Sequence, residues 1–439
     1  MSEQAPKSTP AAIPHWYDPE GDVLDITDGD GAYVTDADGD RYLDFVAQLY
    51  CSNAGHSNQA IIDAMGDQLE RIPYVSPSKH NDTRSKLATE LADIAPGSLS
   101  DVFFSISGSE ANEAAIQIAR DYMDAPKVLT RWRSYHGSTY AAGALTGDPG
   151  TRATLERYAA VTGVTKFLPP MGYNSPFNAD SPEELAELAA DHLEFVIRNE
   201  GPDSIAAILT EPIAGTNGAY TAPPGYFERV RELCDEYDIL LISDEVITGF
   251  GRCGDWFGIG TEGVEPDMIT FAKGVTGAYS PLAGVIAQPE IAAHVHDEGF
   301  SLGQTFGGHP VSCAAGLAAI DEYRGGLIDN VVELAPYFEE RLNDLMDAHD
   351  VVGDVRGRGF HWGIEFSDPE TGEPFFDPRV DEGENPVSKV IAETQQRGVL
   401  VGGGRPTFQI VLSPPLTVDK AEIDEAVDAL EESIVSVFE

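Results

Sequence analysis

Two short apolar runs in the middle of the chain each end in a single charged residue. The run ILLISDEV reaches Asp244, and the run DMITFAK reaches Lys273. A continuous apolar run of this length is typical of a central strand of a parallel sheet, because helices cover both faces of such a strand. In open α/β sheets, ligands bind at the carboxyl ends of the strands. We therefore expect Asp244 and Lys273 to face one crevice at the edge of a mostly parallel sheet.

An amine and a carboxylate at one sheet edge allow two interpretations. The simpler one is an ion pair that stabilises the sheet edge. The other is a cofactor site, in which the Lys273 amine forms a Schiff base with a pyridine aldehyde and Asp244 keeps the ring nitrogen protonated. Lysine is scarce, with 8 lysines against 19 arginines, and glycine-rich turns follow both strands. These features favour the cofactor site, which then needs a place for a phosphate group.

A candidate phosphate site begins where the apolar segment VFFSI runs into SGSEANEAAIQIAR. Ser107 and Glu110 have the spacing of a helix capping box, and alanines then repeat at helical intervals. Free backbone N–H groups and the positive end of the helix dipole favour an anion at such a helix start. Gly108 and Ser109 are therefore candidates to bind a phosphate. Helix caps of this kind are common, and this one indicates a phosphate site only in combination with Lys273.

The chain of 439 residues carries 27 basic and 74 acidic side chains, a formal net charge of −47 at pH 7. Such a charge excludes nucleic acid as an expected partner. The acidic residues are spread along the whole chain among periodic apolar positions, which indicates a folded protein. Uniform acidity with few lysines is typical of cytosolic proteins from halophilic organisms, where concentrated cations screen the repulsion between carboxylates.

The remaining composition excludes several other classes. The four cysteines show neither CxxC spacing nor histidine partners, so we expect no metal site and no disulfide framework. No apolar run is long enough to cross a bilayer, and the first 20 residues lack the apolar core of a signal peptide. We therefore expect a cytoplasmic protein. We expect the proline-rich and polar residues 1 to about 20 to form an arm that is ordered only by packing on something else.

Six sequence blocks resemble one family in their order along the chain. They are SGSEA at 107–111, SYHGST at 134–139, EPIAG at 211–215, DEVITGFGR at 244–252, TFAKG at 270–274 and GGHP at 307–310. Together they resemble the class III, or omega, aminotransferases of the pyridoxal-phosphate enzymes of fold type I. The resemblance implies an α/β fold, with a mostly parallel central sheet flanked by helices in a large domain, and a smaller α+β domain. It also implies the cofactor pyridoxal 5'-phosphate and a homodimer, or a dimer of dimers, with shared active sites.

The resemblance also assigns roles to single residues. Lys273 corresponds to the catalytic Schiff-base lysine, and Asp244 to the partner of the pyridine nitrogen. The other implied cofactor contacts are Val246 behind the ring, Tyr135 in front of it, Gly108 and Ser109 at the phosphate, Glu211 as an acid that supports Asp244 and the ring, and Thr305, which reaches the phosphate of the neighbouring subunit.

The order of the expected elements indicates how the chain divides. Strands and helices alternate up to about residue 320, and a long helix, further strands and a final helix follow. We expect residues 1–65 to be an N-terminal segment that belongs to the small domain. Residues 66–320 are expected to form the large cofactor-binding domain, and residues 321–439 the C-terminal small domain.

The resemblance predicts amino transfer in two half-reactions of a ping-pong mechanism. A donor amine displaces Lys273 from the cofactor, the freed lysine moves a proton, and a keto acid then runs the steps backwards. A cofactor-binding regulator without turnover is disfavoured, because the chain has no basic DNA-binding segment. Other reactions on the same fold, such as those of aminomutases and decarboxylases, stay open.

Three positions bear on the substrates. Thr216 stands where the 2-oxoglutarate enzymes of the family, the ornithine and 4-aminobutyrate types, carry a gating glutamate. The segment QLYCSNAGH resembles a block of omega-amino acid and amine:pyruvate enzymes, and it places Tyr50 at the wall of the substrate site. Arg405 matches the mobile arginine that binds a carboxylate in those enzymes, and its alternative is a surface residue of a glycine-rich loop. The expected reaction moves an amino group from an amine or omega-amino acid to pyruvate, with 2-oxoglutarate as the alternative acceptor.

Overall fold

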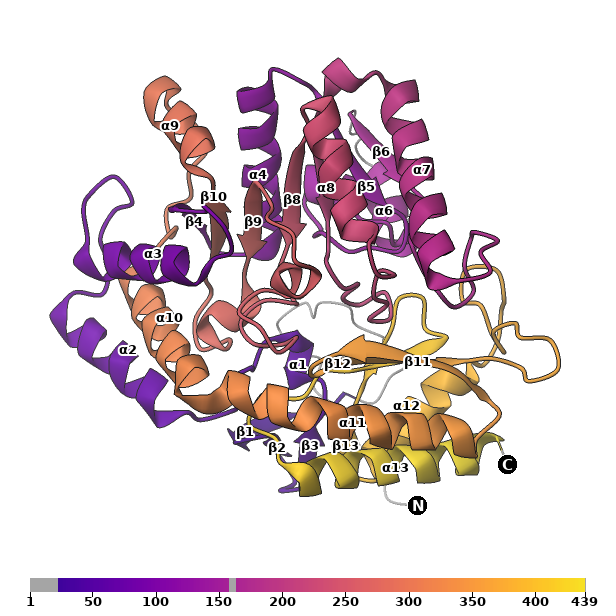
Figure 1. Ribbon diagram of the computed structural model, residues 1–439. Helices are drawn as coiled ribbons and strands as arrows, with labels where there is room; N and C mark the ends of the chain where they lie inside the picture. The colour runs from indigo at the N-terminus through magenta and orange to yellow at the C-terminus, as the bar shows by residue number, and fades with distance from the viewer. Residues whose placement is uncertain (1–22, 158–162, 439) are drawn as a thin grey trace.

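The computed structural model describes residues 23–157 and 163–438, in which three sheets and their covering helices pack together (Figure 1). The arm expected over residues 1 to 20 lies outside the described residues. The largest sheet has seven strands in the order β4-β10-β9-β8-β7-β5-β6. Its strands are β4 (Asp101–Ser105), β5 (Lys127–Arg131), β6 (Val164–Phe167), β7 (Ile205–Thr210), β8 (Leu240–Asp244), β9 (Met268–Phe271) and β10 (Ala283–Ala287).

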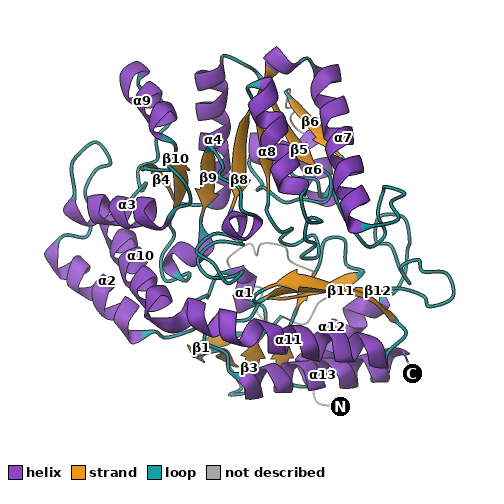
Figure 2. Cartoon of the chain, viewed as in Figure 1, coloured by secondary structure: helices purple, strands orange, loops and turns teal. Residues whose placement is uncertain are grey.

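The seven-stranded sheet is mostly parallel, as the sequence predicts. Strand β10 runs antiparallel to both of its neighbours, whereas the other pairs are parallel. Every residue of β7, β8 and β9 is buried, because helices lie on both faces of the sheet (Figure 2). The covering and connecting helices are α4 (Gly108–Met123), α5 (Tyr140–Leu145), α6 (Pro149–Glu156), α7 (Pro182–Glu200), α8 (Tyr226–Tyr237) and α9 (Pro289–Glu298), with short turns η1 (Pro202–Ser204), η2 (Gly258–Glu262) and η3 (Lys273–Thr276).

Helix α4 shows why the sequence folds this way. The Ser107 hydroxyl accepts a hydrogen bond from the N–H of Glu110 at 3.3 Å, and Glu110 in turn accepts one from the N–H of Ile106 at 3.1 Å. This cap fixes the helix start directly after β4. Small residues such as Ala111 and Ala115 form the buried face of α4, which allows the helix to pack closely on β7, β9 and β10.

Two four-stranded sheets form the lower part of the molecule. One joins the N-terminal hairpin to the C-terminal half, with β1 (Ile26–Asp30), β2 (Tyr33–Asp36), β3 (Arg41–Asp44) and β13 (Val399–Leu400). The other contains β11 (Val352–Arg358), β12 (His361–Phe366), β15 (Gln409–Leu412) and β14 (Gly402–Gly403). The parallel pair β3 and β13 joins a segment near the N-terminus to one in the C-terminal half of the chain.

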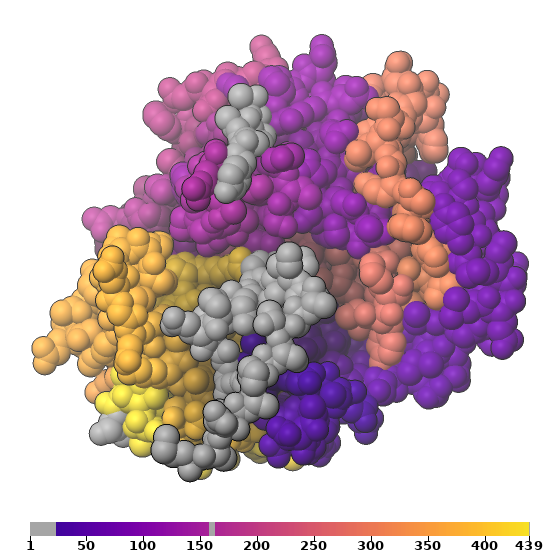
Figure 3. All heavy atoms as spheres, turned by 180° about the vertical axis from the view of Figure 1, so that it is seen from behind, coloured from indigo at the N-terminus to yellow at the C-terminus, as the bar shows by residue number. Residues whose placement is uncertain are grey.

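The remaining helices surround these sheets. They are α1 (Ala47–Tyr50), α2 (Gln59–Arg71), α3 (Asp82–Ile94), α10 (Pro310–Glu322), the π turn η4 (Tyr323–Leu327), α11 (Ile328–Ala348), α12 (Pro386–Gln396) and α13 (Lys420–Phe438). Seen from behind, the orange and yellow C-terminal residues form a block below the purple and magenta part (Figure 3). The expected boundaries after residues 65 and 320 fall inside α2 and α10, so this division stays a prediction.

Candidate active site

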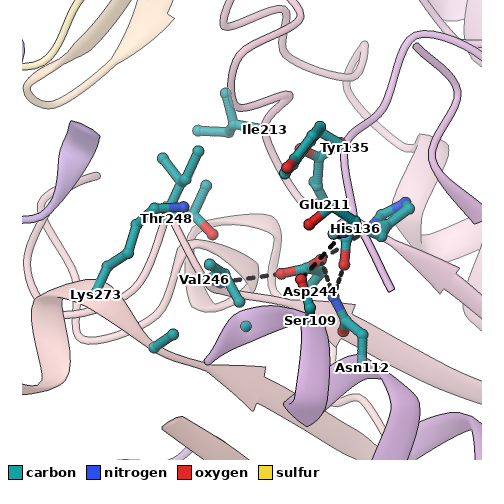
Figure 4. A pocket seen from close by; sticks show the side chains of 15 residues that line it. Ser109, Asn112, Tyr135, His136, Glu211, Ile213, Asp244, Val246, Thr248 and Lys273 are labelled. Carbon is teal, nitrogen blue, oxygen red and sulfur yellow. Dashed lines mark hydrogen bonds and ion pairs between the residues drawn. The ribbon is translucent and has the colours of Figure 1, made fainter. Parts of the chain in front are cut away.

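A cavity of about 190 Å³ lies at the carboxyl edge of the seven-stranded sheet (Figure 4). Asp244 ends β8, Glu211 follows β7 and Lys273 follows β9, so three adjacent strands place these side chains at one edge. The lining also includes the start of α4 and the loop after β5. The lining residues are Gly108, Ser109, Asn112, Tyr135, His136, Gly137, Ser138, Glu211, Ile213, Asp244, Val246, Ile247, Thr248, Ala272 and Lys273.

The Asp244 carboxylate is buried and held by three hydrogen bonds. Its Oδ2 accepts from His136 Nδ1 at 2.8 Å and from Asn112 Nδ2 at 2.9 Å. Its Oδ1 accepts from the N–H of Val246 at 3.1 Å. Burial alone raises the pKa of Asp244, but the hydrogen bonds from His136 and Asn112 outweigh burial and lower the pKa below its usual range. Asp244 is therefore an anion at neutral pH, as a partner of a protonated ring nitrogen must be.

A second layer of contacts orients the two donors to Asp244. His136 Nε2 lies 3.0 Å from the Thr130 hydroxyl, which leaves Nδ1 of the ring for Asp244. Asn112 donates to the backbone oxygen of His136 at 2.7 Å, and its Oδ1 accepts from the Thr270 hydroxyl at 2.8 Å. Residues of α4, β5 and β9 thus fix the orientation of one carboxylate.

The start of α4 forms a cradle for an anion. A Cβ atom on Gly108 would lie 3.0 Å from both methyl groups of Val246, so a larger residue there would press on that side chain. The Ser109 hydroxyl accepts from the N–H of Ser138 at 3.1 Å. Gly137 has φ of +135°, and a Cβ atom there would lie 2.5 Å from the Ser109 hydroxyl. Backbone N–H groups and hydroxyls therefore meet at the positive end of the helix dipole, as a phosphate requires.

Lys273 enters the cavity from the side opposite to Asn112 and His136, beside Thr248 (Figure 4). Its backbone has φ of +47°, an unusual value for a residue with a side chain. Strain of this kind costs about 1–3 kcal/mol and is kept where surrounding contacts enforce it. The left-handed turn at the end of β9 thus directs an amine into the cavity. Val246 lines the same cavity between the cradle and Asp244.

Glu211 lines the cavity but makes no hydrogen bond to Asp244 within the described residues. Its Oε2 lies 3.4 Å from Arg131, and its Oε1 accepts from the N–H of Gly215 at 3.0 Å. Burial raises the pKa of Glu211, which Arg131 counteracts. Support of Asp244 therefore comes from His136 and Asn112, and a role of Glu211 toward the cofactor ring stays a prediction.

Arg405 lines a second cavity, which shares Ser138 with the first and which we call its mouth, and Tyr135 lines the first cavity beside Arg405. The Arg405 guanidinium carbon is 5.3 Å from the centre of the Tyr135 ring, a cation–π distance. Its Nη1 is 3.4 Å from the Thr151 hydroxyl, and its backbone N–H donates to the oxygen of Thr216 at 2.7 Å. Arg405 thus lies beside Tyr135, the aromatic residue predicted for the site. The neutral Thr216 lies next to the backbone of Arg405.

Tyr50 and Thr305 occupy different positions relative to the cavity. Tyr50 is buried and packs with Ile247, which lines the cavity. Burial raises the pKa of Tyr50 to about 12, so it stays a neutral phenol. Thr305 is exposed and does not line the cavity of its own chain, and its backbone oxygen accepts from the Tyr74 hydroxyl at 3.0 Å. This position is compatible with a contact to a second subunit.

Sequence reasoning missed Asn112 and His136. A signal existed for Asn112, because a single amide on the alanine-rich buried face of α4 needs a polar partner. His136 directly follows Tyr135, but nothing in the sequence shows which strand end its ring faces. Within the described residues, no group of three or more His, Cys, Asp or Glu side chains is arranged to hold a metal ion.

We expect His136→Gln to weaken cofactor binding about tenfold, because a hydrogen bond to a charged group contributes about 1.5–3 kcal/mol. The measurement is a titration of the cofactor-free protein with pyridoxal phosphate, followed by absorbance. His294→Gln is the matched control, since His294 pairs with Asp121 at 3.0 Å on the surface. Equal affinities of the two variants would show that His136 does not position Asp244.

The donor set fits one class of cofactor. An ionised buried carboxylate faces a lysine amine across a cavity, and a phosphate cradle closes one end. Together with the seven-stranded sheet, this arrangement defines a pyridoxal-phosphate enzyme of fold type I. The roles predicted for Asp244 at the ring nitrogen, for Gly108 and Ser109 at the phosphate and for Lys273 as the carrier of the cofactor are compatible with this arrangement and stay predictions.

Comparisons with known proteins identify the family. The model of the class III aminotransferases matches residues 16–434, so the chain belongs to this family and uses pyridoxal phosphate. It is 38% identical to a probable aminotransferase from Mycobacterium tuberculosis, covering 91% of this chain and 87% of that protein. It is 35% identical to a diaminobutyrate–2-oxoglutarate transaminase from Halomonas elongata, covering 94% and 90%.

A solved structure agrees with the whole fold. The amine transaminase of an uncultivated Pseudomonas species, in its PLP-bound form, has a TM-score of 0.90 and 32% identity, covering 97% of this chain and 99% of that one. No helix among the described residues is long and apolar enough to cross a membrane.

Proposed function

We propose that the chain transfers an amino group from an amine or omega-amino acid to pyruvate in two half-reactions. Pyridoxal phosphate supplies, when bound, a carbonyl that takes up the amino group and a ring that withdraws electrons. Lys273 holds the cofactor and, once displaced, moves the proton that leaves the substrate carbon. Asp244 keeps the ring nitrogen protonated through its own negative charge. Tyr135 covers the open face of the ring.

The position of Arg405 carries the proposal for the acceptor. Its guanidinium lies over Tyr135 at the mouth of the cavity, where it can bind the carboxylate of a keto acid. No carboxylate stands at position 216 to compete for it, since Thr216 is neutral and contacts the Arg405 backbone. A short keto acid with one carboxylate fits this arrangement.

The alternative acceptor is 2-oxoglutarate, which the relative from Halomonas elongata uses according to its name. That acceptor carries two carboxylates and needs a second cation besides Arg405. Among the described residues that line the cavity and its mouth, Lys273 and Arg405 are the only lysine and arginine. Lys273 is engaged by the cofactor, so the lining favours the acceptor with one carboxylate.

Steady-state rates with both acceptors test this assignment. We expect pyruvate to be the better acceptor, and Arg405→Ala to raise the KM for pyruvate at least about 30-fold, because a charge-assisted pair contributes about 2–3 kcal/mol. A donor without a carboxylate should be little affected by the same substitution.

Arg397→Ala serves as control, since Arg397 pairs with Glu393 and Glu432 away from the cavity. A preference for 2-oxoglutarate, or equal losses of Arg405→Ala toward substrates with and without a carboxylate, would place the enzyme in the other branch of the family.

An exposed apolar patch supports a homodimer with shared active sites. Tyr74 and Phe306 pack edge to face at 6.2 Å, and their exposed fractions are 40% and 54%. Leu69 and Ile72, at the end of α2, are also exposed. Thr305 lies within this patch, so a second subunit that covers it would contact the threonine that the resemblance assigns to the partner's phosphate. We further propose that the dimer works in the cytoplasm of a cell with high internal salt.

A further inference from the structure

The short segment α1 has a backbone conformation that residues with side chains rarely adopt. The φ angle is +46° at Ala47, +58° at Gln48 and +62° at Tyr50. Such angles raise the free energy of each residue, so they persist only where surrounding contacts enforce them, and they gather at functional sites. We call residues 47–53 the Tyr50 loop and ask what enforces its conformation.

The Tyr50 loop lies beside the space in which a substrate would react. At its end, a Cβ atom on Gly274, the residue after Lys273, would lie 2.7 Å from Asn53 Nδ2. Tyr50 packs against the lining of the cofactor cavity. Burial raises the pKa of Tyr50, and the charge of Arg405 counteracts part of this rise. The loop therefore runs from the neighbour of Lys273 to the surroundings of Arg405.

One buried carboxylate holds the start of the Tyr50 loop. Asp44 ends β3 and is fully buried. Its Oδ2 accepts from the N–H of Gln48 at 2.9 Å and from the side-chain amide of Gln48 at 3.0 Å, and its Oδ1 lies 3.1 Å from the same N–H. Hydrogen bonds to a carboxylate are stronger than those to a neutral acceptor. Asp44 therefore holds the residue whose φ and ψ, +58° and −79°, fall outside both helix and strand.

His56 fixes the orientation of Asp44 from the other side. Its Nε2 lies 2.9 Å from Asp44 Oδ2. The backbone of His56 exchanges two hydrogen bonds with Gly31, at 2.7 and 3.1 Å, and a Cβ atom on Gly29 would lie 3.0 Å from the Cβ atom of His56. His56 is thus anchored to the N-terminal hairpin independently of the loop, and its ring orients the Asp44 carboxylate.

We propose that Asp44, oriented by His56, is a positioning residue that keeps the Tyr50 loop in its strained conformation and so determines which size of amine donor packs against Tyr50. The inference rests on the proposed function and concerns the specificity of the same site. Without the bonds from Asp44, relief of the strain moves the loop, and a small donor loses the wall that Tyr50 forms. A bulky donor loses less, because it fills the space without that wall.

Asp44→Asn tests this role, because asparagine keeps the size of the side chain and removes its charge. Propylamine serves as the small donor and benzylamine as the bulky one, and absorbance follows the rate at which each converts the cofactor in a single half-reaction. We expect the ratio of kcat/KM for propylamine to that for benzylamine to fall about tenfold, since a gap of one methylene in a pocket changes specificity by about 10–200-fold. The affinity for pyridoxal phosphate should stay unchanged.

Further variants separate positioning from general stability. Glycine adopts a positive φ without strain, so Gln48→Gly combined with Asp44→Asn should restore most of the lost ratio. His56→Leu removes one hydrogen bond to Asp44 and should lower the ratio about threefold, which keeps the test available if Asp44→Asn does not fold. Asp36→Asn is the matched control, since Asp36 accepts from the N–H groups of Asp38 and Asp40 at 3.0 and 2.9 Å in the neighbouring hairpin.

The ratio and its recovery decide the outcome. A lowered ratio that Gln48→Gly restores supports the inference. Equal losses with both amines, an unchanged ratio in Asp44→Asn and His56→Leu, or a lowered ratio without recovery would overturn it and leave the proposed function intact. If the wild-type protein converts neither amine, the donor class of the proposed function is wrong and the inference falls with it.

Discussion

Lys273→Ala is expected to remove the visible absorption of the lysine-bound cofactor and to lower the rate of amino transfer about 10³-fold or more. The substitution takes away both the covalent link and the group that moves the substrate proton, and a positioned proton-transfer group alone contributes about 10²–10⁴-fold. Absorbance spectra and single-turnover rates of the reconstituted protein measure the two effects separately.

We expect the Lys273→Ala protein to keep its fold. Lys273 has φ of +47°, and alanine bears the same left-handed strain as lysine because both carry a Cβ atom. Lys127→Ala is the matched control, since Lys127 starts β5 at the opposite edge of the sheet and pairs with Glu200 at 2.8 Å. A Lys273→Ala protein with an unchanged spectrum and a near-normal rate would mean that another amine carries the cofactor.

The parts of the site that sequence alone predicts are those with a local signature. The buried strands β8 and β9 are continuous apolar runs, and the positions of Asp244, which ends β8, and Lys273, two residues after β9, follow from where those runs end. The cap of α4 likewise depends only on residues that lie close together in the sequence. Each of these features depends on fewer than about ten neighbouring positions, so periodicity and capping rules are sufficient to find them.

The partners of Asp244 have no such signature. Asn112 and His136 lie 132 and 108 residues away along the chain, and only the parallel strand order brings them to one carboxylate.

Salt concentration is expected to change the stability of the protein by a large amount. With a formal net charge of −47, neighbouring carboxylates repel one another unless ions screen them. The Debye length is about 10 Å at 0.1 M salt and about 3 Å at 1 M, whereas side chains one helical turn apart are separated by about 5–6 Å. We therefore expect Tm to rise roughly 10 °C or more from 0.1 M to 2 M potassium chloride, and the proposed dimer to dissociate in dilute buffer. Equal Tm values at both concentrations would refute the halophilic interpretation.

Two glutamates of helix α7 test whether repulsion between carboxylates causes the expected dependence of Tm on salt. Glu183, Glu187 and Asp191 are exposed and follow one another at intervals of four residues, while Leu185 and Ala189 face the core. Glu187→Gln removes a charge between two like charges, so it should raise Tm by about 1 °C in 0.1 M potassium chloride and not in 2 M. Glu194→Gln should give no such gain, because Glu194 pairs with Arg198 at 2.5 Å and accepts from the Tyr237 hydroxyl at 2.8 Å. If both variants shift Tm alike, or if sucrose stabilises the protein as well as potassium chloride does, the salt acts through general exclusion from the surface rather than through screening of carboxylates.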